Sequence, residues 1–166
     1  MPLHYVDPHK KRSRWNKANE RVFRTRPGQF VARHVFWNVD PWLYRASRGR
    51  YPTIIGGTAT APLVSTGAKS DQRREHQLTY FHDGADPILI ASNAGGLKHP
   101  QWYHNLKAHP ECEFGDERFT ATEVTDPDEY TRLYGLAEQV YAGYGDYREK
   151  TAVTGRKIPV FRLTPR

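Results

Sequence analysis

The chain has 166 residues, 37% hydrophobic and 13% aromatic, with 25 Lys and Arg against 18 Asp and Glu and a net charge of +7. This length suits one compact domain, and no apolar stretch approaches the ~20 residues of a membrane-spanning helix. The single cysteine excludes an intramolecular disulfide framework and a thiolate-only metal cluster, and it indicates an intracellular protein.

Positive charge is concentrated at the N-terminus. Residues 1–50 carry 12 Lys and Arg and 3 Asp and Glu, a net charge of +9, whereas residues 51–166 carry 13 and 15, a net charge of −2. Such an excess favours an anionic partner, with nucleic acid, a membrane surface and a phosphorylated small molecule all open. The first 14 residues, which include Lys10-Lys11-Arg12, are typical of a mobile basic arm.

The segment from Phe30 to Arg45 is amphipathic at helical spacing, with Val31, Val35 and Trp42 on its apolar face. This pattern fits a helix packed on the protein's own core, and it also fits an interfacial helix on an anionic membrane. We therefore divide the chain into a basic arm with an amphipathic helical segment over 1–50 and a second domain over 51–166.

From Tyr51 onward, short runs rich in β-branched and aromatic residues predict strands. The predicted strands cover residues 60–66, 77–82, 87–92, 111–114, 118–124 and 157–163. One helix is expected between His99-Pro100 and Pro110, and another from the Asp126-Pro127 cap to about Ala142. Closely spaced strands with two late helices predict a mostly β (α+β) fold, a small antiparallel barrel with flanking helices.

The common catalytic and metal-binding motifs are absent from the sequence. His99, His104 and His109 recur every five residues, a spacing that does not place them on one helical face, so no metal site is expected. Cys112 lies between two glutamates whose charges disfavour a thiolate, so we interpret it as a structural residue.

A turn after the first predicted strand has the composition of a phosphate site. Within six residues it offers backbone amides, a hydroxyl and three cations, from Lys69, Ser70, Arg73 and Arg74. A plain polar hairpin turn is the alternative, because Asp71 and Glu75 partly cancel the positive charge.

Two further segments stand out. Residues 91–96 end an apolar strand with small side chains and paired glycines, which would let a planar ring approach the backbone, although an ordinary loop has the same composition. Tyr141, Tyr144 and Tyr147 recur every three residues, so they could wall an apolar pocket with their hydroxyls in water or simply pack a helix.

Several segments together resemble the deazaflavin (F420)-dependent nitroreductases of actinobacteria, also called F420H2-dependent quinone reductases. They are STGAKS (65–70), ASNAGG (91–96), HPQWYHNLKAHP (99–110), YAGYGDY (141–147) and KIPVFRLTP (157–165). The similarity runs in unbroken order from about Pro41 to Thr164, and its most specific piece is P-x-W-Y-x-N-L-K-A-x-P. It implies a split β-barrel of the flavin-reductase type, which agrees with the predicted strands.

The resemblance also implies an oxidoreductase in which reduced coenzyme F420, an 8-hydroxy-5-deazaflavin, donates hydride to a quinone-like or nitroaromatic acceptor. Residue by residue, it implies a phosphate held by Lys69, Ser70, Arg73 and Arg74, a deazaflavin ring along Ser92 and Asn93, a cofactor groove lined by Trp102 and Lys107, and a substrate facing Tyr141, Tyr144 and Tyr147. Ser92 and the three tyrosines are thus the candidate catalytic residues. The segment before the barrel would help to cover the substrate, with a cytoplasmic location at the inner face of the cell membrane.

Some positions depart from the family pattern T-G-R-K-[ST]-G-Q-P-R. Ala68 replaces an arginine, Asp71 a glycine and Arg73 a proline, which should weaken phosphate binding unless Arg73 compensates. Thr79 stands where the nitroreductase branch has a substrate-side tyrosine. Flavin mononucleotide on the same barrel, or a cofactor- or membrane-binding protein without turnover, are the alternative functions. Nucleic-acid binding is not expected, because no reader motif accompanies the basic segment.

Overall fold

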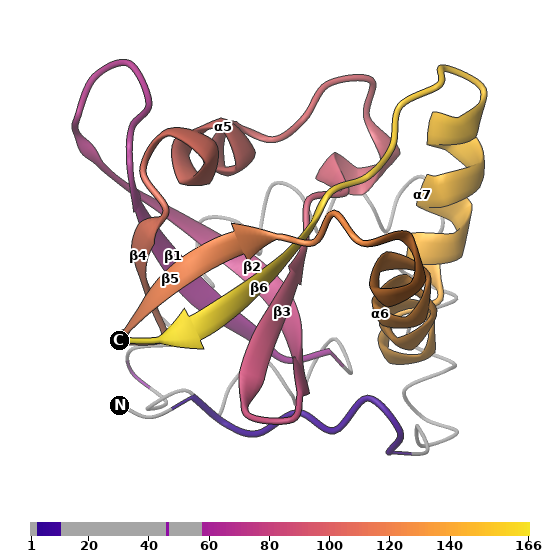
Figure 1. The fold of residues 1–166 in the computed structure, drawn as a ribbon, viewed down its shortest axis with the longest axis horizontal. Helices are drawn as coiled ribbons and strands as arrows, with labels where there is room; N and C mark the ends of the chain where they lie inside the picture. Colours follow the sequence, from indigo (N-terminus) through magenta and orange to yellow (C-terminus); the bar gives the residue numbers. More distant parts are fainter. Residues whose placement is uncertain (1–2, 11–45, 47–57) are drawn as a thin grey trace.

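The computed structural model describes residues 3–10, 46 and 58–166, and within these ranges six strands form a closed barrel (Figure 1). The strands are β1 (Thr60–Thr66), β2 (Arg73–Asp83), β3 (Asp86–Ile90), β4 (Glu111–Phe114), β5 (Glu117–Glu123) and β6 (Val160–Pro165). Their order around the barrel is β1-β2-β3-β6-β5-β4, and every neighbouring pair is antiparallel. The predicted fold class, mostly β with flanking helices, is confirmed.

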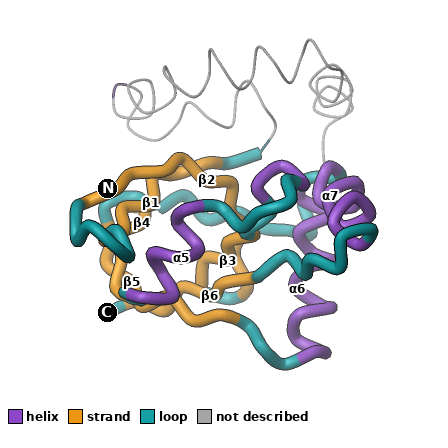
Figure 2. Tube along the Cα trace, turned by 90° about the horizontal axis from the view of Figure 1, so that it is seen from above, coloured by secondary structure: helices purple, strands orange, loops and turns teal. Residues whose placement is uncertain are grey.

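Helices occupy the outside of this barrel. They are α5 (Gln101–Ala108), α6 (Pro127–Val140) and α7 (Gly143–Ala152), and a short 3-10 helix, η2 (Asn93–Gly95), follows β3. Figure 2 shows α6 and α7 together on one side of the barrel, with α5 apart from them. No helix in the described ranges has both the length and the apolar character needed to cross a bilayer.

The alternation of side chains along each strand creates two hydrophobic cores. Tyr80 of β2 points into the barrel, where it joins Leu63, Phe114 and Phe161. The next residue, Phe81, belongs to the second core, which fills the space between the barrel wall and helices α6 and α7. The barrel therefore has helices packed on one outer face, and this second core fixes where α7 lies.

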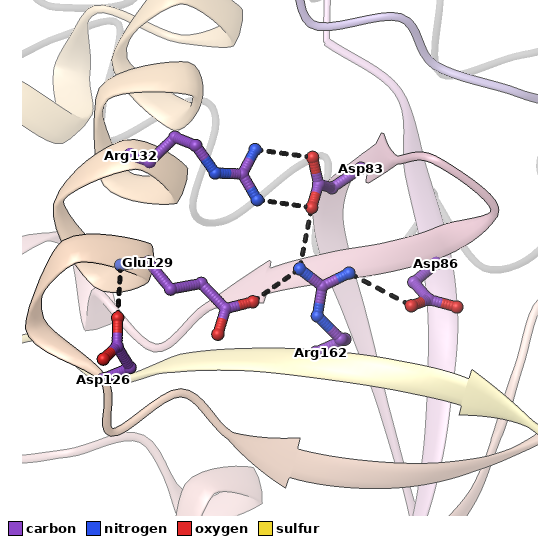
Figure 3. A network of polar contacts seen from close by, with 6 residues as sticks. All are labelled: Asp83, Asp86, Asp126, Glu129, Arg132 and Arg162. Atoms are coloured by element: carbon purple, nitrogen blue, oxygen red, sulfur yellow. Dashed lines mark hydrogen bonds and ion pairs between the residues drawn. The ribbon is translucent and has the colours of Figure 1, made fainter.

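The start of α6 follows from its capping residues. Asp126 accepts a hydrogen bond from the Glu129 N–H at 2.8 Å, and Pro127 occupies the first helical position, as predicted. Ion pairs then join this helix to the barrel through a cluster that we call the α6 clasp. Its members are Asp83, Asp86, Glu129, Arg132 and Arg162 (Figure 3).

Several predicted boundaries were wrong. β2 begins at Arg73 instead of residue 77, because the β1 pairing continues as far as Thr66↔Arg73 and extends β2 through the polar residues 73–76. β3 ends at Ile90, since the chain turns into η2, and the last strand begins at Val160. α7 was not predicted, because its glycines and polar residues give it almost no apolar periodicity.

Residues 3–10 differ from the predicted mobile arm, because they lie against the barrel. The N–H of Val6 donates to Nδ1 of His82 at 3.0 Å, and the N–H of His82 donates back to the Val6 carbonyl at 2.9 Å. Leu3 donates to Glu117, and Tyr80 donates to the His4 carbonyl, both at 2.8 Å. The predicted amphipathic segment, residues 30–45, lies outside the described residues.

Candidate functional site

The β1–β2 turn that was predicted to hold a phosphate is compact and closed by backbone hydrogen bonds. The N–H of Gly67 donates to the Gln72 carbonyl at 2.8 Å, and the N–H of Asp71 donates to the Gly67 carbonyl at 2.9 Å. A Cβ on Gly67 would lie 2.6 Å from Oγ of Ser70 and 3.2 Å from the Gln72 carbonyl oxygen, so a larger residue here would displace the Ser70 hydroxyl and crowd the turn. This geometry leaves Lys69 and Ser70 exposed at the tip of the turn.

The charges of the turn are partly engaged by neighbouring groups. Arg73 pairs with Glu113 at 2.8 Å, and Arg74 donates to the side chain of Gln72 at 3.0 Å. Asp71 lies 3.4 Å from Nε2 of His109. Lys69, Ser70 and Arg74 are therefore brought together on one turn, whereas the charge of Arg73 is opposed by a carboxylate.

Asn105 of α5 is a residue of this region that the sequence reasoning did not single out. It is fully buried, accepts a hydrogen bond from the Ala68 N–H at 3.1 Å, and donates to Oγ of Ser65 at 3.1 Å. Its amide thus ties the turn to helix α5. The sequence does contain a signal for this role. Asn105 is a polar residue of the P-x-W-Y-x-N-L-K-A-x-P segment, and helical spacing places it on the same side of the helix as Trp102 and Leu106.

The loop after β3 and the tyrosine segment come together in space. Asn93, Ala94 and Gly95 have φ values of 50°, 50° and 73°. A Cβ on Gly95 would lie 3.1 Å from Cδ1 of Tyr147, so the loop packs directly on α7. The amide side chain of Asn93 donates to the Lys98 carbonyl at 2.9 Å, within the loop. Residues 91–96 and 141–147, both singled out in the sequence, are therefore neighbours.

The three tyrosines form one cluster. Their ring centroids lie 5.5 to 6.2 Å apart, and the hydroxyls of Tyr141 and Tyr147 are separated by 3.4 Å. Tyr144 is buried and hydrogen-bonded to Thr79, whereas Tyr141 and Tyr147 are half-buried. Burial raises the pKa of Tyr144 and of Tyr147 well above the ordinary value of 10.0. These hydroxyls are thus neutral near pH 7 and can donate hydrogen bonds.

The two residues predicted to line a groove have other contacts. Trp102 is only 4% exposed, and its ring lies 5.9 Å from that of Phe161 inside the barrel core. Lys107 forms an ion pair with Glu123 at 2.8 Å and is otherwise exposed. The structure does not bring either side chain into contact with the turn or with the tyrosine cluster.

The predicted elements nevertheless face one end of the barrel. Because β2 and β3 are antiparallel, β3 ends toward the side on which the β1–β2 turn lies. β6 begins on that side as well, and α5 lies between the β1–β2 turn and the loop after β3 (Figure 1). The turn and η2 thus lie toward the same end of the barrel, and α7 packs on η2 there.

Neither a thiolate nor a metal centre is found in this arrangement. Cys112 is buried, and burial raises the pKa of its thiol to about 12, so it stays protonated, in keeping with a structural role. Among the described residues, no three His, Cys, Asp or Glu side chains gather as metal ligands would.

The chain is similar to known proteins over most of its length. Residues 37–165 match the family model described as F420H(2)-dependent quinone reductase. An F420H(2)-dependent quinone reductase of Mycobacterium tuberculosis is 39% identical over 149 residues, which cover 83% of this chain and 97% of that protein.

The chain is also similar to solved structures. An F420-H2-dependent reductase, FDR-A, is 34% identical with a TM-score of 0.56, covering 63% of this chain and 93% of that one. A structure described as a domain-swapped dimer is 29% identical with a TM-score of 0.57, covering 75% and 98%. The chain belongs to the F420H(2)-dependent quinone reductase family.

Proposed function

We propose that this protein is an oxidoreductase that transfers hydride from reduced coenzyme F420 to a quinone. The observation that carries the proposal is the meeting of three family segments, the β1–β2 turn, the loop after β3 and the tyrosine cluster, at one end of the barrel. When bound, the reduced deazaflavin supplies the hydride, so the protein needs to bind and orient rather than to provide a nucleophile.

The β1–β2 turn fits the phosphate of such a cofactor. Lys69, Ser70 and Arg74 supply two cations and a hydroxyl, which would hold an anion by charge-assisted hydrogen bonds. Gly67 allows the turn to be tight, and Asn105 ties it to helix α5 through the Ala68 N–H. Arg73 would contribute less, because Glu113 already pairs with it.

The loop and the tyrosines would serve the reacting part of the site. Ser92 and Asn93 would lie along the ring, while Tyr141 and Tyr147, which retain exposed surface, would face the acceptor. Because the pKa of Tyr147 is raised by burial, its hydroxyl would act as a hydrogen-bond donor to a quinone oxygen, not as a base. Tyr144 would support this wall through Thr79. Trp102 would shape the groove from the core, and Lys107 would act at its rim.

Cofactor titration and turnover test this function. Binding should quench the fluorescence of F420, and the unaltered protein should oxidise reduced F420 when menadione is added. Lys69→Ala should weaken cofactor binding, and Tyr147→Phe should slow quinone reduction. Arg118→Ala is the control for the loss of an exposed cation, because Arg118 lies on β5 beside the β4–β5 turn and is not part of the β1–β2 turn. Absence of both binding and turnover would refute the proposal, and a yellow protein as purified would favour flavin mononucleotide instead.

A nitroaromatic compound is proposed as a second acceptor. Thr79, which stands in place of a family tyrosine, is hydrogen-bonded to Tyr144. The tyrosine cluster therefore still has two hydroxyl groups at this position. Reduction of a small nitroaromatic compound, assayed beside menadione with the same preparation, tests this. Turnover with menadione alone would restrict the acceptor to quinones.

The N-terminal segment is proposed to place the protein at the cytoplasmic face of the cell membrane. Support comes from the net charge of +9 over residues 1–50, ahead of a barrel domain proposed for 51–166. The protein should sediment with vesicles that contain anionic lipid. Replacing Lys10, Lys11 and Arg12 by Gln should reduce the bound fraction, and equal binding to neutral vesicles would contradict the proposal.

A further inference from the structure

Arg156 lies in the connection between α7 and β6 and binds the loop after β3 at several points. Its Nη2 donates to the Ala91 carbonyl at 2.7 Å, and its Nη1 donates to the carbonyls of Ser92, at 3.1 Å, and Gly96, at 2.7 Å. Its Nε donates to Nδ1 of His99 at 3.3 Å. This one side chain, 64 residues from Ser92 in the sequence, therefore bonds Ala91 and Ser92 at the start of the loop, Gly96 at its end and His99 just after it.

The conformation of this loop needs such support. Asn93, Ala94 and Gly95 occupy the left-handed region in succession, and Ala94 has neither the missing Cβ of glycine nor the short polar side chain of asparagine. Strained backbone of this kind persists only where the surroundings determine it. The loop's own backbone bonds, from Gly95 N–H to the Ser92 carbonyl and from Gly96 N–H to the Asn93 carbonyl, span only the central turn, and the Asn93 side chain adds one bond to the Lys98 carbonyl. The Ala91 N–H donates to the Pro159 carbonyl at 2.9 Å, and Arg156 supplies three further bonds to loop carbonyls from the connection between α7 and β6.

The arrangement suits an arginine and no other cation. A guanidinium offers five N–H donors in a fixed planar fork, whereas a lysine ammonium has three donors at one point. His99 accepts through Nδ1, and the pKa of His99 is lowered by burial and by the charge of Arg156, which keeps this ring a neutral acceptor. The Tyr103 ring covers His99 with 4.5 Å between centroids, so the acceptor is fixed as well.

We propose that Arg156 is a positioning residue for the cofactor, which it affects by holding residues 91–99 in the shape that presents Ser92 and Asn93. This inference rests on the proposed function, in which these two residues lie along the deazaflavin ring. Arg156 itself does not need to touch the ligand, because its bonds already go to the loop. Its sequence position, near the start of KIPVFRLTP, gives no hint of this role.

The test compares Arg156→Lys with Arg162→Lys. Arg162 is the matched control, because it too donates hydrogen bonds to several residues, Asp83, Asp86 and Glu129, but in the α6 clasp. Amide hydrogen exchange of the cofactor-free protein should become about tenfold faster in residues 91–99 for Arg156→Lys and should be unchanged there for Arg162→Lys. The dissociation constant and the KM for F420 should rise about tenfold in Arg156→Lys only, with the KM for menadione unchanged.

Failure of this inference can be told apart from failure of the proposed function. If the unaltered protein does not bind F420, the proposed function is overturned whatever the variants do. If the unaltered protein binds F420 while Arg156→Lys keeps normal loop exchange and normal affinity, only the role of Arg156 is overturned. Equal loss of affinity in both lysine variants, in step with their melting temperatures, would indicate general destabilisation and would also overturn it.

Discussion

Asp71 shows how a single residue can be accommodated where the family pattern has glycine. Its φ of 51° lies in the left-handed region, which Asp tolerates better than most residues with a Cβ. The carboxylate lies 3.4 Å from His109, yet it still places negative charge within the turn that carries Lys69. The cost of the substitution is thus expected in anion binding more than in folding.

Asp71→Gly should therefore tighten cofactor binding. Removing a carboxylate beside a bound phosphate should lower the dissociation constant by about 3- to 10-fold at low salt. Stability should change by less than about 0.5 kcal/mol, because relief of backbone strain is offset by the greater freedom of glycine in the unfolded chain. Fluorescence titration with F420 at low and high salt measures the gain, which should shrink as salt rises.

The chain contains its own control for this change. Asp116 also has a positive φ, 70°, but lies in the β4–β5 turn next to Pro62, at the opposite end of β1 from the phosphate turn. Asp116→Gly repeats the same chemistry away from the site and should leave the F420 affinity unchanged. If both variants bind more tightly by the same factor, net charge and not the turn would be responsible.

Asn105 is expected to contribute to both stability and binding. Asn105→Ala leaves the Ala68 N–H and the buried Ser65 hydroxyl without these partners, which should cost about 1–3 kcal/mol. Urea unfolding measures the loss, and F420 titration should show weaker binding because the turn is freed. Gln101→Ala on the same helix is the control, since its contact with Asn105 is exposed on the Gln101 side and long, at 3.4 Å. Similar losses in both variants would contradict the special role of Asn105.

At the scale of elements, the α6 clasp joins a helix to two parts of the barrel wall. Arg132 of α6 holds both carboxylate oxygens of Asp83, at 2.8 and 2.7 Å. Arg162 of β6 reaches Asp83, Asp86 and Glu129 at 2.6 to 3.0 Å (Figure 3). The hydrogen bond from Arg132 holds the pKa of Asp83 well below its ordinary value of 3.8. The clasp thus opposes protonation of this carboxyl in the folded protein.

Loss of the clasp should be visible as a change in acid stability. Because the folded pKa of Asp83 is depressed, its contribution is present above the unfolded value and is lost as pH falls below about 5. Asp83→Asn should cost about 1–3 kcal/mol at pH 7 and should flatten the fall in unfolding free energy between about pH 5 and pH 3. Urea unfolding across this range tests it, with the exposed Asp128→Asn as control. If the unfolding free energy of Asp83→Asn falls with pH as steeply as that of the unaltered protein, the Asp83 carboxyl does not cause the loss of stability in acid.

The accuracy of prediction differs between elements for physical reasons. β1 and β4 begin and end where the sequence predicts, because alternating patterns and turn residues are local signals. α7 could not be predicted, since two glycines and scattered polar residues leave little periodicity. Tertiary contacts stabilise it, among them packing against η2, the hydrogen bond from Tyr134 and the ion pair between Arg148 and Glu138. Asn105 and Arg156 could not be assigned for a similar reason, because their partners lie 37 to 65 residues away.

At the scale of the whole molecule, residues 3–10 link the start of the chain to both hydrophobic cores. Val6 packs against both of them, and its backbone is bonded to His82 in both directions. The Tyr5 ring stacks on the His82 ring with 4.8 Å between centroids. Since Nδ1 of His82 accepts the Val6 N–H, the docked arrangement requires that this nitrogen carry no proton.

Docking of this segment should therefore weaken as the pH falls. Burial lowers the pKa of His82 below its ordinary value of 6.5, although Glu117 and Asp86 nearby oppose the shift. The docked state binds fewer protons than the released state, so docking is complete above about pH 6.5 and is lost as the pH falls below it. Hydrogen exchange of residues 3–10, corrected for intrinsic rates, should become about 5- to 10-fold faster between about pH 7.5 and pH 5.5.

A variant that keeps the acceptor but cannot titrate decides whether His82 is responsible. His82→Asn places a side-chain oxygen near the position of Nδ1, so it can still accept the Val6 N–H at every pH. Its exchange over residues 3–10 should be independent of pH after the same correction, while exchange in the β4–β5 hairpin should match the unaltered protein. If the variant keeps the pH dependence of the unaltered protein, another group controls docking, and the bond from Val6 to His82 is only structural.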